Sequence, residues 1–534
     1  METNSNCEIP LETAKFAKSL FLGNILENVI YPFPSIKEPE AETLELVLNS
    51  VKKFLEDHTD KFSEYDREGT FPDSYIEGLK ELGLFSLIIP EDFGGLGLSN
   101  LAYSRVFQET SYFDASTSVT LGAHSSIGMK GLLLFGSEEQ KAKYLPKLAT
   151  GEMIAAFCLT EPGAGSDAAS IKTTASKQSD GSWILNGSKL WISNGSLADF
   201  FTVFARTDSG EKGKISAFIV ERGYPGVSIG PKEDKMGIRA SATTAVDFND
   251  VRLPPEALLG EEGKGFKVAM SILNNGRTGL GGGCVGGIKR CIALAVRQAS
   301  DRKQFGRPIS EFMLIKGKIA QMTVDCFATE SMVSTVASMM DRGVLDYSVE
   351  AAMSKVFASE AMWHAANEAL QIAGGNGFMK EYPYERILRD SRINLIFEGT
   401  NEILRLYIAL SGLKTAGNYL KEVTKGMINV FNDPIKGFGV FSDYAVRKLS
   451  HLTPLGRDRL EFVPQPLRQE AEIFENYTVE FAKTVEWVLR TYRERVVGSQ
   501  LLSKRIADVA IDLFAGLCTL SRVSTLIEKR GEEN

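Results

Sequence analysis

The chain has 534 residues, of which 43% are hydrophobic and 24% are charged, so it is long enough to form several globular domains. Its formal net charge of -8 argues against a general nucleic-acid binder. No run of about 18 consecutive apolar residues occurs, so the sequence predicts no transmembrane helix.

The first 30 residues do not match the common targeting signals. They contain Glu2, Glu8, Glu12 and Glu27 and no arginine, unlike a secretory signal or a typical mitochondrial presequence. The cysteines form no CxxC pair and the histidines match no metal-ligand spacing, so we expect reduced thiols and no metal site. These features predict a cytoplasmic protein of bacterial type, or a mitochondrial-matrix protein if the source is eukaryotic.

The first segment, residues 1–154, is predicted to be an α-helical domain. Apolar residues recur there at helical spacings of three and four. The turn-rich stretch PEDFGGLGLSN (90–100) interrupts the pattern, and Ser99 or Asn100 is the candidate cap of the helix that follows.

The rest of the chain is predicted to hold three further regions, which makes the fold class multidomain α+β. Residues 155–264 contain short β-branched or alternating runs such as SWILNG, FFTVFAR and ISAFIVE, which predict a middle β-sandwich or barrel domain. Helical periodicity returns over 265–413, a C-terminal four-helix bundle. A stretch punctuated by Gly, Pro and Asn (411–440) then leads into an additional α-helical region within 414–534.

The run GLGGGCVGG (279–287) contains a formal GxGxxG pattern at Gly281, Gly283 and Gly286. A dinucleotide-binding fingerprint needs a strand before it and a βαβ unit around it. Here a helical pattern, GFKVAMSILNNGR, comes first. The glycines are therefore predicted to allow close packing between helices.

Two stretches in the β region are candidates for ligand contact. CLTEPGAGSD (158–167) ends a strand and enters a glycine-rich turn, and such turns can hold a pyrophosphate through main-chain amides. In KLWISNG (189–195), Trp191 and Ser193 lie two apart in a strand and project from one face, which suits a flat heterocycle. Taken alone, each stretch is better explained as an ordinary turn or core strand.

Glu398 lies between the apolar residues of RINLIFEGTNEILRLY (392–407) and a glycine. A carboxylate against Ile and Phe is costly if it is ionised and unpaired. One explanation is a carboxylate at a helix N-terminus, because Gly399 and Thr400 precede a helical pattern. Local sequence alone favours this explanation over a functional one.

Considered together, the motifs resemble the acyl-CoA dehydrogenase family from about Phe16 to at least Ser521. The matching segments occur in order as FCLTEPGAGSD, KLWISNG, GFKVAMSILNNGR, RKQFG, QIAGGNGF, RILRD and IFEGTNEILR. VTLGAH (119–124), RLYIAL and the added C-terminal helices are most similar to the very-long-chain branch. The resemblance implies FAD-dependent α,β-dehydrogenation of long- or very-long-chain fatty acyl-CoA to trans-2-enoyl-CoA in β-oxidation, with electrons passed to electron-transfer flavoprotein.

The resemblance also implies roles for individual residues. Glu398 would be the base, and the preceding apolar run would desolvate its carboxylate and raise its pKa. Some relatives carry the base at the position of Gly276, which cannot act as one. The implied substrate-binding residues are Ser166, Asn274, Arg277 and Gly399. The implied FAD-binding residues are Phe157, Leu159, Thr160, Gly165, Ser166, Trp191, Ile192, Ser193, Arg302, Gln304, Phe305, Gln371, Gly374, Gly375, Thr400, Asn401 and Glu402.

Partners and alternatives follow from the same resemblance. A homo-oligomer, most simply a dimer, is expected, in which Arg302 and Gln371 reach the FAD of the other subunit. Small residues in SVTLGAHSSIG (118–128) suggest a deep acyl tunnel, although they could serve only helix packing. An apolar stripe with basic edges in Val440–Leu452 suggests peripheral contact with the inner membrane, or packing on its own domain. The alternative functions are an acyl-CoA oxidase and a scaffold role in respiratory-complex assembly.

Overall fold

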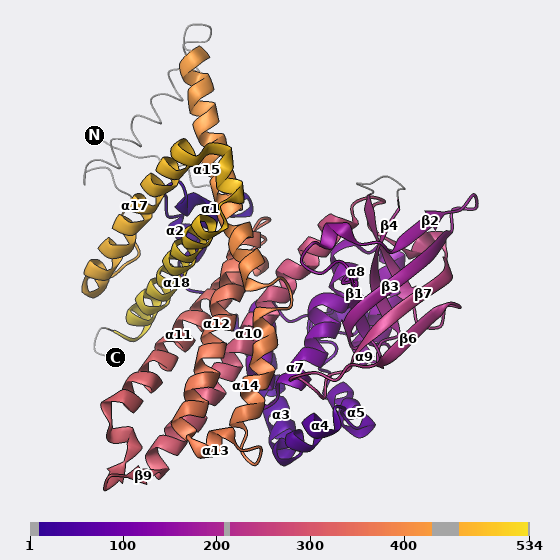
Figure 1. The fold of residues 1–534 in the computed structure, drawn as a ribbon, viewed down its shortest axis with the longest axis horizontal. Coiled ribbons are helices and arrows are strands. Elements are labelled where there is room, and N and C mark those ends of the chain that lie inside the picture. The colour runs from indigo at the N-terminus through magenta and orange to yellow at the C-terminus, as the bar shows by residue number, and fades with distance from the viewer. Residues whose placement is uncertain (1–9, 208–213, 430–458, 532–534) are drawn as a thin grey trace. The chain divides into compact units, whose positions relative to one another are not determined.

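The computed structural model describes residues 10–207, 214–429 and 459–531 (Figure 1). The predicted membrane-contact stretch Val440–Leu452 lies outside these residues. The chain divides into two compact units. The unit that we call the mixed unit comprises residues 36–326 and 358–400. The helical unit comprises the described residues before 36, residues 327–357 and the described residues from 401 onward.

The predicted N-terminal helical domain is confirmed as helical. From residue 36 onward it belongs to the mixed unit, whereas its described residues before 36 belong to the helical unit. Ser99 caps α6 as expected, since its Oγ accepts the Ala102 N–H at 3.2 Å. A π-helical turn, Ala123–Gly128, follows α7. The helices of this part are α3 (Glu38–Asp57), α4 (Phe62–Glu68), α5 (Asp73–Glu81), α6 (Asn100–Phe113), α7 (Ala115–Gly122), α8 (Lys130–Phe135) and α9 (Glu138–Thr150).

The predicted middle β domain is confirmed as an eight-stranded sheet with the order β6-β7-β3-β2-β4-β5-β8, in which β1 pairs with β4 in parallel. Its core is apolar and includes the buried rings of Trp183, Phe201 and Phe218. The strands are β1 (Ala155–Cys158), β2 (Thr174–Lys177), β3 (Trp183–Ser193), β4 (Phe200–Arg206), β5 (Ile215–Glu221), β6 (Val227–Lys232), β7 (Thr243–Leu253) and β8 (Leu258–Leu259).

A second set of helices follows the sheet in the chain, as predicted. A short hairpin, β9 (Lys303–Gln304) with β10 (Arg307–Pro308), separates the first two of them. The helices are α10 (Gly265–Asp301), α11 (Met313–Asp341), α12 (Ser348–Ala373), α13 (Gly375–Phe378), α14 (Tyr384–Ser391) and α15 (Asn401–Asn429).

The glycines of α10 pack this helix against α6. A Cβ on Gly282 would lie 2.8 Å from the Ser104 carbonyl oxygen, and a Cβ on Gly286 would lie 2.0 Å from that of Gln108. Only glycine permits such a close approach. The prediction that these glycines serve helix packing is confirmed. By length and composition alone α10 could cross a membrane, but 56% of its apolar window is buried inside the protein.

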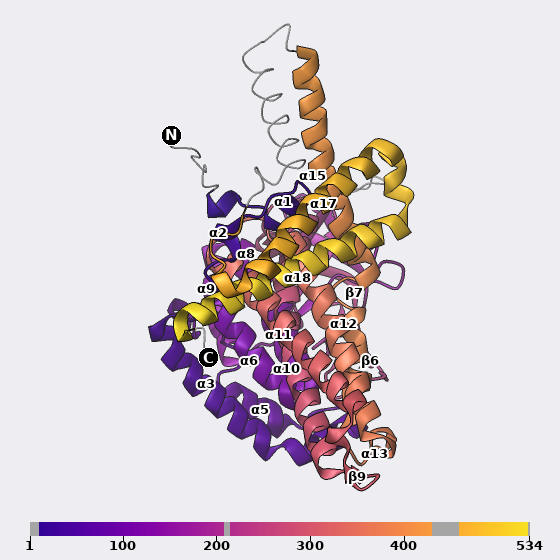
Figure 2. The same ribbon diagram turned by 90° about the vertical axis from the view of Figure 1, so that its left-hand side faces the viewer.

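The helical unit is built around α15 and the C-terminal helices α17 (Arg468–Tyr492) and α18 (Gln500–Arg530), with α1 (Phe16–Leu20) and α2 (Glu27–Ile30) (Figures 1 and 2). Aromatic contacts join its early and late segments, for example Phe21 with Phe481 at 4.9 Å between ring centroids. The stretch punctuated by Gly, Pro and Asn is helical from residue 411 to Asn429, because α15 continues that far. Gly412 does not break the helix. Phe21 packs against it, and a Cβ there would lie 2.2 Å from the Phe21 ring.

Candidate functional site

Glu398 lies in a turn that follows a short 3-10 helix, Arg392–Leu395. Its backbone is left-handed, with φ of 58°, and that of Gly399 has φ of 97°. A left-handed non-glycine residue costs roughly 1–3 kcal/mol and is commonly found at functional sites. Because α15 begins at Asn401, Glu398 lies outside its first turn, and the helix N-terminus explanation loses its basis.

The Glu398 carboxylate lies against the bare backbone of α10 at Gly276. A Cβ on Gly276 would be 2.9 Å from Oε1 and 3.1 Å from Oε2 of Glu398, and 2.8 Å from Cγ2 of Ile127. Contacts under 3.0 Å are repulsive, so any side chain at position 276 would displace either neighbour. The glycine therefore makes room for the carboxylate beside an apolar methyl group.

Arg277 holds the turn that carries Glu398. Its Nε donates to the Glu398 carbonyl oxygen at 3.3 Å, and its Nη1 donates to Asn274 Oδ1 at 2.7 Å. The Arg277 side chain is largely buried. The structure thus brings three predicted residues together: Arg277 and Asn274 of α10, and Glu398 in the turn beside this helix. Gly399 follows directly in the same turn.

Gly279 lies about one helical turn along α10 from Gly276 and packs against Tyr103 and Ser126. The sequence analysis missed both of these residues. A Cβ on Gly279 would be 2.7 Å from Ser126 Oγ and 3.4 Å from Tyr103 Cε1. The two hydroxyls are hydrogen-bonded at 2.6 Å. Burial raises the pKa of the Tyr103 phenol far above its usual range, and the charge of Glu398 adds to this increase. The glycine spacing on α10 was the one available signal for this contact.

The apolar run before Glu398 shields it unevenly. Leu395 and Phe397 are partly buried, whereas Ile396 is 47% exposed. The expected desolvation by this run is therefore incomplete within one chain, and Ile127 supplies an apolar contact that the local sequence could not indicate.

The predicted flavin turn follows β1. Leu159 is buried, Phe157 and Thr160 are partly buried, and the turn then comes to the surface at Gly165 and Ser166. The turn is tight, since Glu161 and Ala164 exchange backbone hydrogen bonds at 3.0 and 3.1 Å. A Cβ on Gly165 would meet no atom within 4 Å, so open space lies beside the turn.

Trp191 lies where β3 leaves regular pairing. The register of β3 with β7 shifts between Lys189 and Ile192, and Trp191 has φ of 57°. The irregularity leaves the indole 63% exposed, while Ile192 is buried and Ser193 partly buried. The Leu190 N–H donates to the Thr160 carbonyl oxygen at 2.9 Å, so the structure brings this strand and the predicted flavin turn together.

A second group of predicted residues lies away from β3, at the β9–β10 hairpin and beside α13 (Figures 1 and 2). Large apolar side chains there are exposed, including Phe305 (93%), Phe378 (82%) and Leu314 (83%). The predicted residues of this group, all exposed, are Arg302, Gln304, Phe305, Gln371, Gly374 and Gly375.

The remaining predicted residues are Thr400, Asn401 and Glu402. Thr400 ends the mixed unit, and the other two begin α15 in the helical unit. Asn401 is buried, and its Oδ1 accepts a hydrogen bond from Lys355 Nζ at 2.8 Å. The side chain of Asn401 therefore contributes to the interior of the helical unit.

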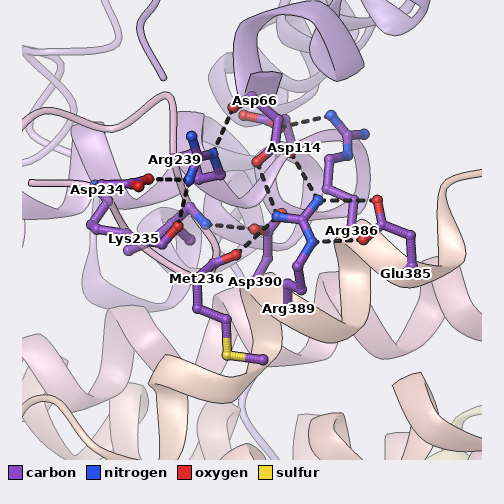
Figure 3. A network of polar contacts seen from close by, with 11 residues as sticks. Asp66, Asp114, Asp234, Lys235, Met236, Arg239, Glu385, Arg386, Arg389 and Asp390 are labelled. Atoms are coloured by element: carbon purple, nitrogen blue, oxygen red, sulfur yellow. Dashed lines mark hydrogen bonds and ion pairs between the residues drawn. The ribbon is translucent and has the colours of Figure 1, made fainter. Parts of the chain in front are cut away.

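A network of charged residues fixes α14, which leads to the Glu398 turn (Figure 3). Arg389 binds Asp66 at 2.8 Å and Glu385 at 2.6 Å, while the Asp390 carboxyl accepts the Ile238 N–H. Burial raises the pKa of Asp390 to about 7. The network explains the RILRD motif, because its last two residues join α14 to α4 and to the loop between β6 and β7.

The residues present fit FAD. An indole held exposed by a left-handed backbone offers a flat face, and a glycine turn with open space beside it offers main-chain amides for phosphate oxygens. The two are joined through Leu190 and Thr160. Arg302 and Gln371 lie exposed at a separate surface of the chain.

Comparison with known proteins gives matches along most of the chain. The N-terminal, middle and C-terminal domain models of acyl-CoA dehydrogenase match residues 41–152, 156–251 and 263–413, and the ACAD9/ACADV C-terminal domain model matches 465–533. The human mitochondrial very long-chain specific acyl-CoA dehydrogenase is 45% identical over 96% of this chain and 79% of its own length.

Solved structures agree. The acyl-CoA dehydrogenase of Bacillus anthracis complexed with FAD is 33% identical, with a TM-score of 0.81 over 97% of this chain and 87% of its own. Butyryl-CoA dehydrogenase of Megasphaera elsdenii is 38% identical, with a TM-score of 0.68 over 71% of this chain and 99% of its own. This chain belongs to the acyl-CoA dehydrogenase family of FAD-dependent oxidoreductases.

Proposed function

We propose that the protein dehydrogenates long- or very-long-chain acyl-CoA thioesters between Cα and Cβ, with Glu398 as the base and electron-transfer flavoprotein as the electron acceptor. The observation that carries the proposal is the placement of the Glu398 carboxylate on Gly276 of α10, in a left-handed turn held by Arg277. The 45% identity to the human very long-chain enzyme supports the choice of substrate class.

The reaction requires a base for the α-proton of the thioester and an acceptor for the β-hydrogen. FAD, when bound, accepts the β-hydrogen as hydride. Glu398 takes the α-proton on its carboxylate, and Arg277 keeps the carbonyl oxygen of the same residue in place, which fixes the direction of the side chain. By the family resemblance, the Glu398 backbone N–H donates to the thioester oxygen, where negative charge develops.

FAD would be held by the turn at Thr160–Ser166 and by Trp191 of one chain, with Arg302 and Gln371 contributed by a second copy. The exposed apolar residues around the β9–β10 hairpin and α13 support self-association, because monomeric proteins rarely expose several large apolar side chains together. A homodimer is the simplest assembly that supplies both groups.

Small, buried residues in α7 and the π-helical turn bear on the chain-length proposal. Ser118 and Ala123 are buried, and a Cβ on Gly122 would lie 3.2 Å from the Phe107 ring. The Phe107 contact shows that Gly122 packs against α6, so the long-chain proposal draws its main support from the identity to the human very long-chain enzyme. Each further buried methylene of a substrate contributes about 0.8 kcal/mol until the tunnel ends.

Turnover of purified protein against a series of acyl-CoA substrates tests the function. kcat/KM should rise through C12 to C16 with electron-transfer flavoprotein as acceptor under anaerobic conditions. A maximum at C4 to C8 would refute the long-chain assignment, and turnover that requires oxygen would identify an oxidase. A flavin-loaded protein with no turnover on any chain length would favour the scaffold role.

We further propose a cytoplasmic or matrix location with reversible contact to anionic membranes through Val440–Leu452. Flotation with anionic vesicles at low and high salt tests it. Binding at low salt that is lost in the double variant Phe441→Asp/Leu449→Asp supports the contact, whereas flotation that the double variant leaves unchanged contradicts it.

A further inference from the structure

The mixed unit contains a buried ion pair between Glu161 and Lys189. Lys189 Nζ lies 2.7 Å from Glu161 Oε1, and the side chains are 0% and 5% exposed. The same ammonium donates to the Leu159 carbonyl oxygen at 3.1 Å. Lys189 belongs to none of the groups assigned above to base, substrate or FAD. Glu161 lies within the Thr160–Ser166 turn, but its side chain is buried and was given no role.

The Glu161 carboxylate closes the segment that contains the flavin turn. Its Oε2 accepts the Lys172 N–H at 2.5 Å, and its Oε1 accepts the Thr173 N–H at 3.0 Å. Residues 162–171, which include Gly165 and Ser166, are thus tied at both ends to one side chain. Although burial opposes ionisation, the Lys189 ammonium and the N–H donors hold the pKa of Glu161 below its usual range.

Lys189 connects this closure to the irregularity of β3. It is the last residue before the register shift, and the next residue, Leu190, donates its N–H to Thr160. Trp191 then adopts its left-handed conformation. One ion pair therefore lies where the flavin turn crosses the strand that presents the indole.

Stability alone does not account for a pair in this position. A buried ion pair is a weak stabiliser, because desolvation offsets most of the attraction, and apolar residues of similar volume often serve as well. A carboxylate differs from an apolar side chain because it can accept hydrogen bonds from Lys172, Thr173 and Lys189 at once.

We propose that Glu161 and Lys189 are positioning residues that fix the Thr160–Ser166 turn relative to Trp191 and so preorganise the FAD site. The inference rests on the proposed flavin site. It predicts that the pair controls FAD affinity separately from the stability of the fold.

The test uses purified holoenzyme variants Glu161→Gln, Lys189→Met, Lys189→Arg and the double variant Glu161→Leu/Lys189→Met. FAD dissociation constants come from flavin fluorescence, Tm from thermal unfolding, and local order from amide hydrogen exchange over residues 161–173. Lys177→Met is the matched control, because Lys177 forms an exposed pair with Glu262 at 2.9 Å in the same sheet.

Glu161→Gln and Lys189→Met should raise the FAD dissociation constant at least about tenfold and speed exchange over 161–173, since ordering a loose loop weakens binding. Lys189→Arg keeps the cation and should lose less FAD affinity than Lys189→Met. The double variant should recover Tm but not FAD affinity. If Lys189→Met does not fold, the comparison of Glu161→Gln with Lys189→Arg carries the test.

FAD affinity and exchange equal to wild type in folded Glu161→Gln would overturn the inference while leaving the flavin site intact. Recovery of FAD affinity together with Tm in the double variant would also overturn it, because the pair would then matter only for stability. Wild-type protein that purifies without FAD and binds none would remove the proposed flavin site itself, and this inference with it.

Discussion

At the scale of single residues, the site depends on the lack of side chains at two glycines of α10 as much as on Glu398. Gly276 and Gly279 bring the helix backbone against the Glu398 carboxylate and against the Tyr103–Ser126 pair. A carboxylate whose position is set by such contacts should respond strongly to one added methyl group.

The variant Gly276→Ala tests this directly. The new Cβ would lie under 3.2 Å from both Glu398 carboxylate oxygens and from Ile127, so the carboxylate must move. Misplacing a catalytic group by about 1 Å can reduce the rate about 100-fold. We expect kcat to fall about 10- to 100-fold, with FAD content unchanged, as measured by turnover and visible spectrum.

Gly317→Ala in α11 is the matched control, because a Cβ there meets no atom within 4 Å. It should keep wild-type kcat and could gain up to about 1 kcal/mol in stability, as an alanine replaces a glycine in a helix interior. Equal kcat for the Gly276→Ala variant and the wild type would show that the carboxylate is not held at this position.

The chemistry of the site was predictable from its motifs to different degrees. The family resemblance indicated Glu398, Arg277 and Asn274, which the structure brings together. It gave no indication of Tyr103, Ser126 or Ile127, because these come from α6 and the π-helical turn and carry no motif of their own. Contacts between residues more than 100 positions apart depend on packing, which local patterns do not encode.

At the scale of elements, α14 connects the charged network of Figure 3 to the Glu398 turn. Asp390 faces Arg386, Asp114, Asp66 and Lys235. Its pKa of about 7 in the folded protein exceeds the usual value of 3.8. The folded state therefore binds this proton more tightly than the unfolded state does.

The sign of the pH effect follows. The stabilisation from protonated Asp390 is complete below about pH 4 and is lost as the pH rises through about 7. The variant Asp390→Asn stays neutral and keeps the oxygen that accepts the Ile238 N–H. We expect the Tm of wild type minus that of Asp390→Asn to fall between pH 5 and 7.5. Parallel Tm curves would show that Asp390 is ionised throughout this range.

Element boundaries were predictable where local signals agreed with packing. Ser99 caps α6 as its sequence indicates. The stretch after 411 carries glycines and polar residues, yet α15 continues to Asn429, and Phe21, nearly 400 residues earlier, packs onto Gly412. The β3 irregularity at Trp191 was missed because an alternating pattern does not show where a strand gains an unpaired residue.

At the scale of the whole molecule, one exposed surface should decide both assembly and cofactor content. The predicted partner-facing residues lie beside Phe305, Phe378 and Leu314, all more than 80% exposed. The division of the chain into four segments stays a prediction. The structure groups the chain into two compact units.

The variant Phe305→Asp should shift the protein toward monomers and lower its FAD occupancy, because it places a charge in an apolar contact. Arg302→Ala should lower FAD occupancy without dissociating the assembly, since it removes a charged contact to phosphate. Sedimentation velocity and the flavin-to-protein ratio measure both. Leu46→Asp on α3, where Leu46 is 71% exposed, is the control and should change neither. A monomeric wild type with stoichiometric FAD would contradict the shared site.

The central claim is that Glu398 removes the α-proton, and the variant Glu398→Gln tests it most directly. Glutamine has nearly the same shape but cannot accept the proton, and loss of a general base typically lowers the rate about 100- to 10,000-fold. Single-turnover reduction of the bound flavin by a C16 acyl-CoA is the measurement, with Glu91→Gln, an exposed glutamate, as control. We predict a flavin-loaded, folded Glu398→Gln variant whose rate falls at least 100-fold. A rate above about a tenth of wild type with flavin bound would mean that another group is the base.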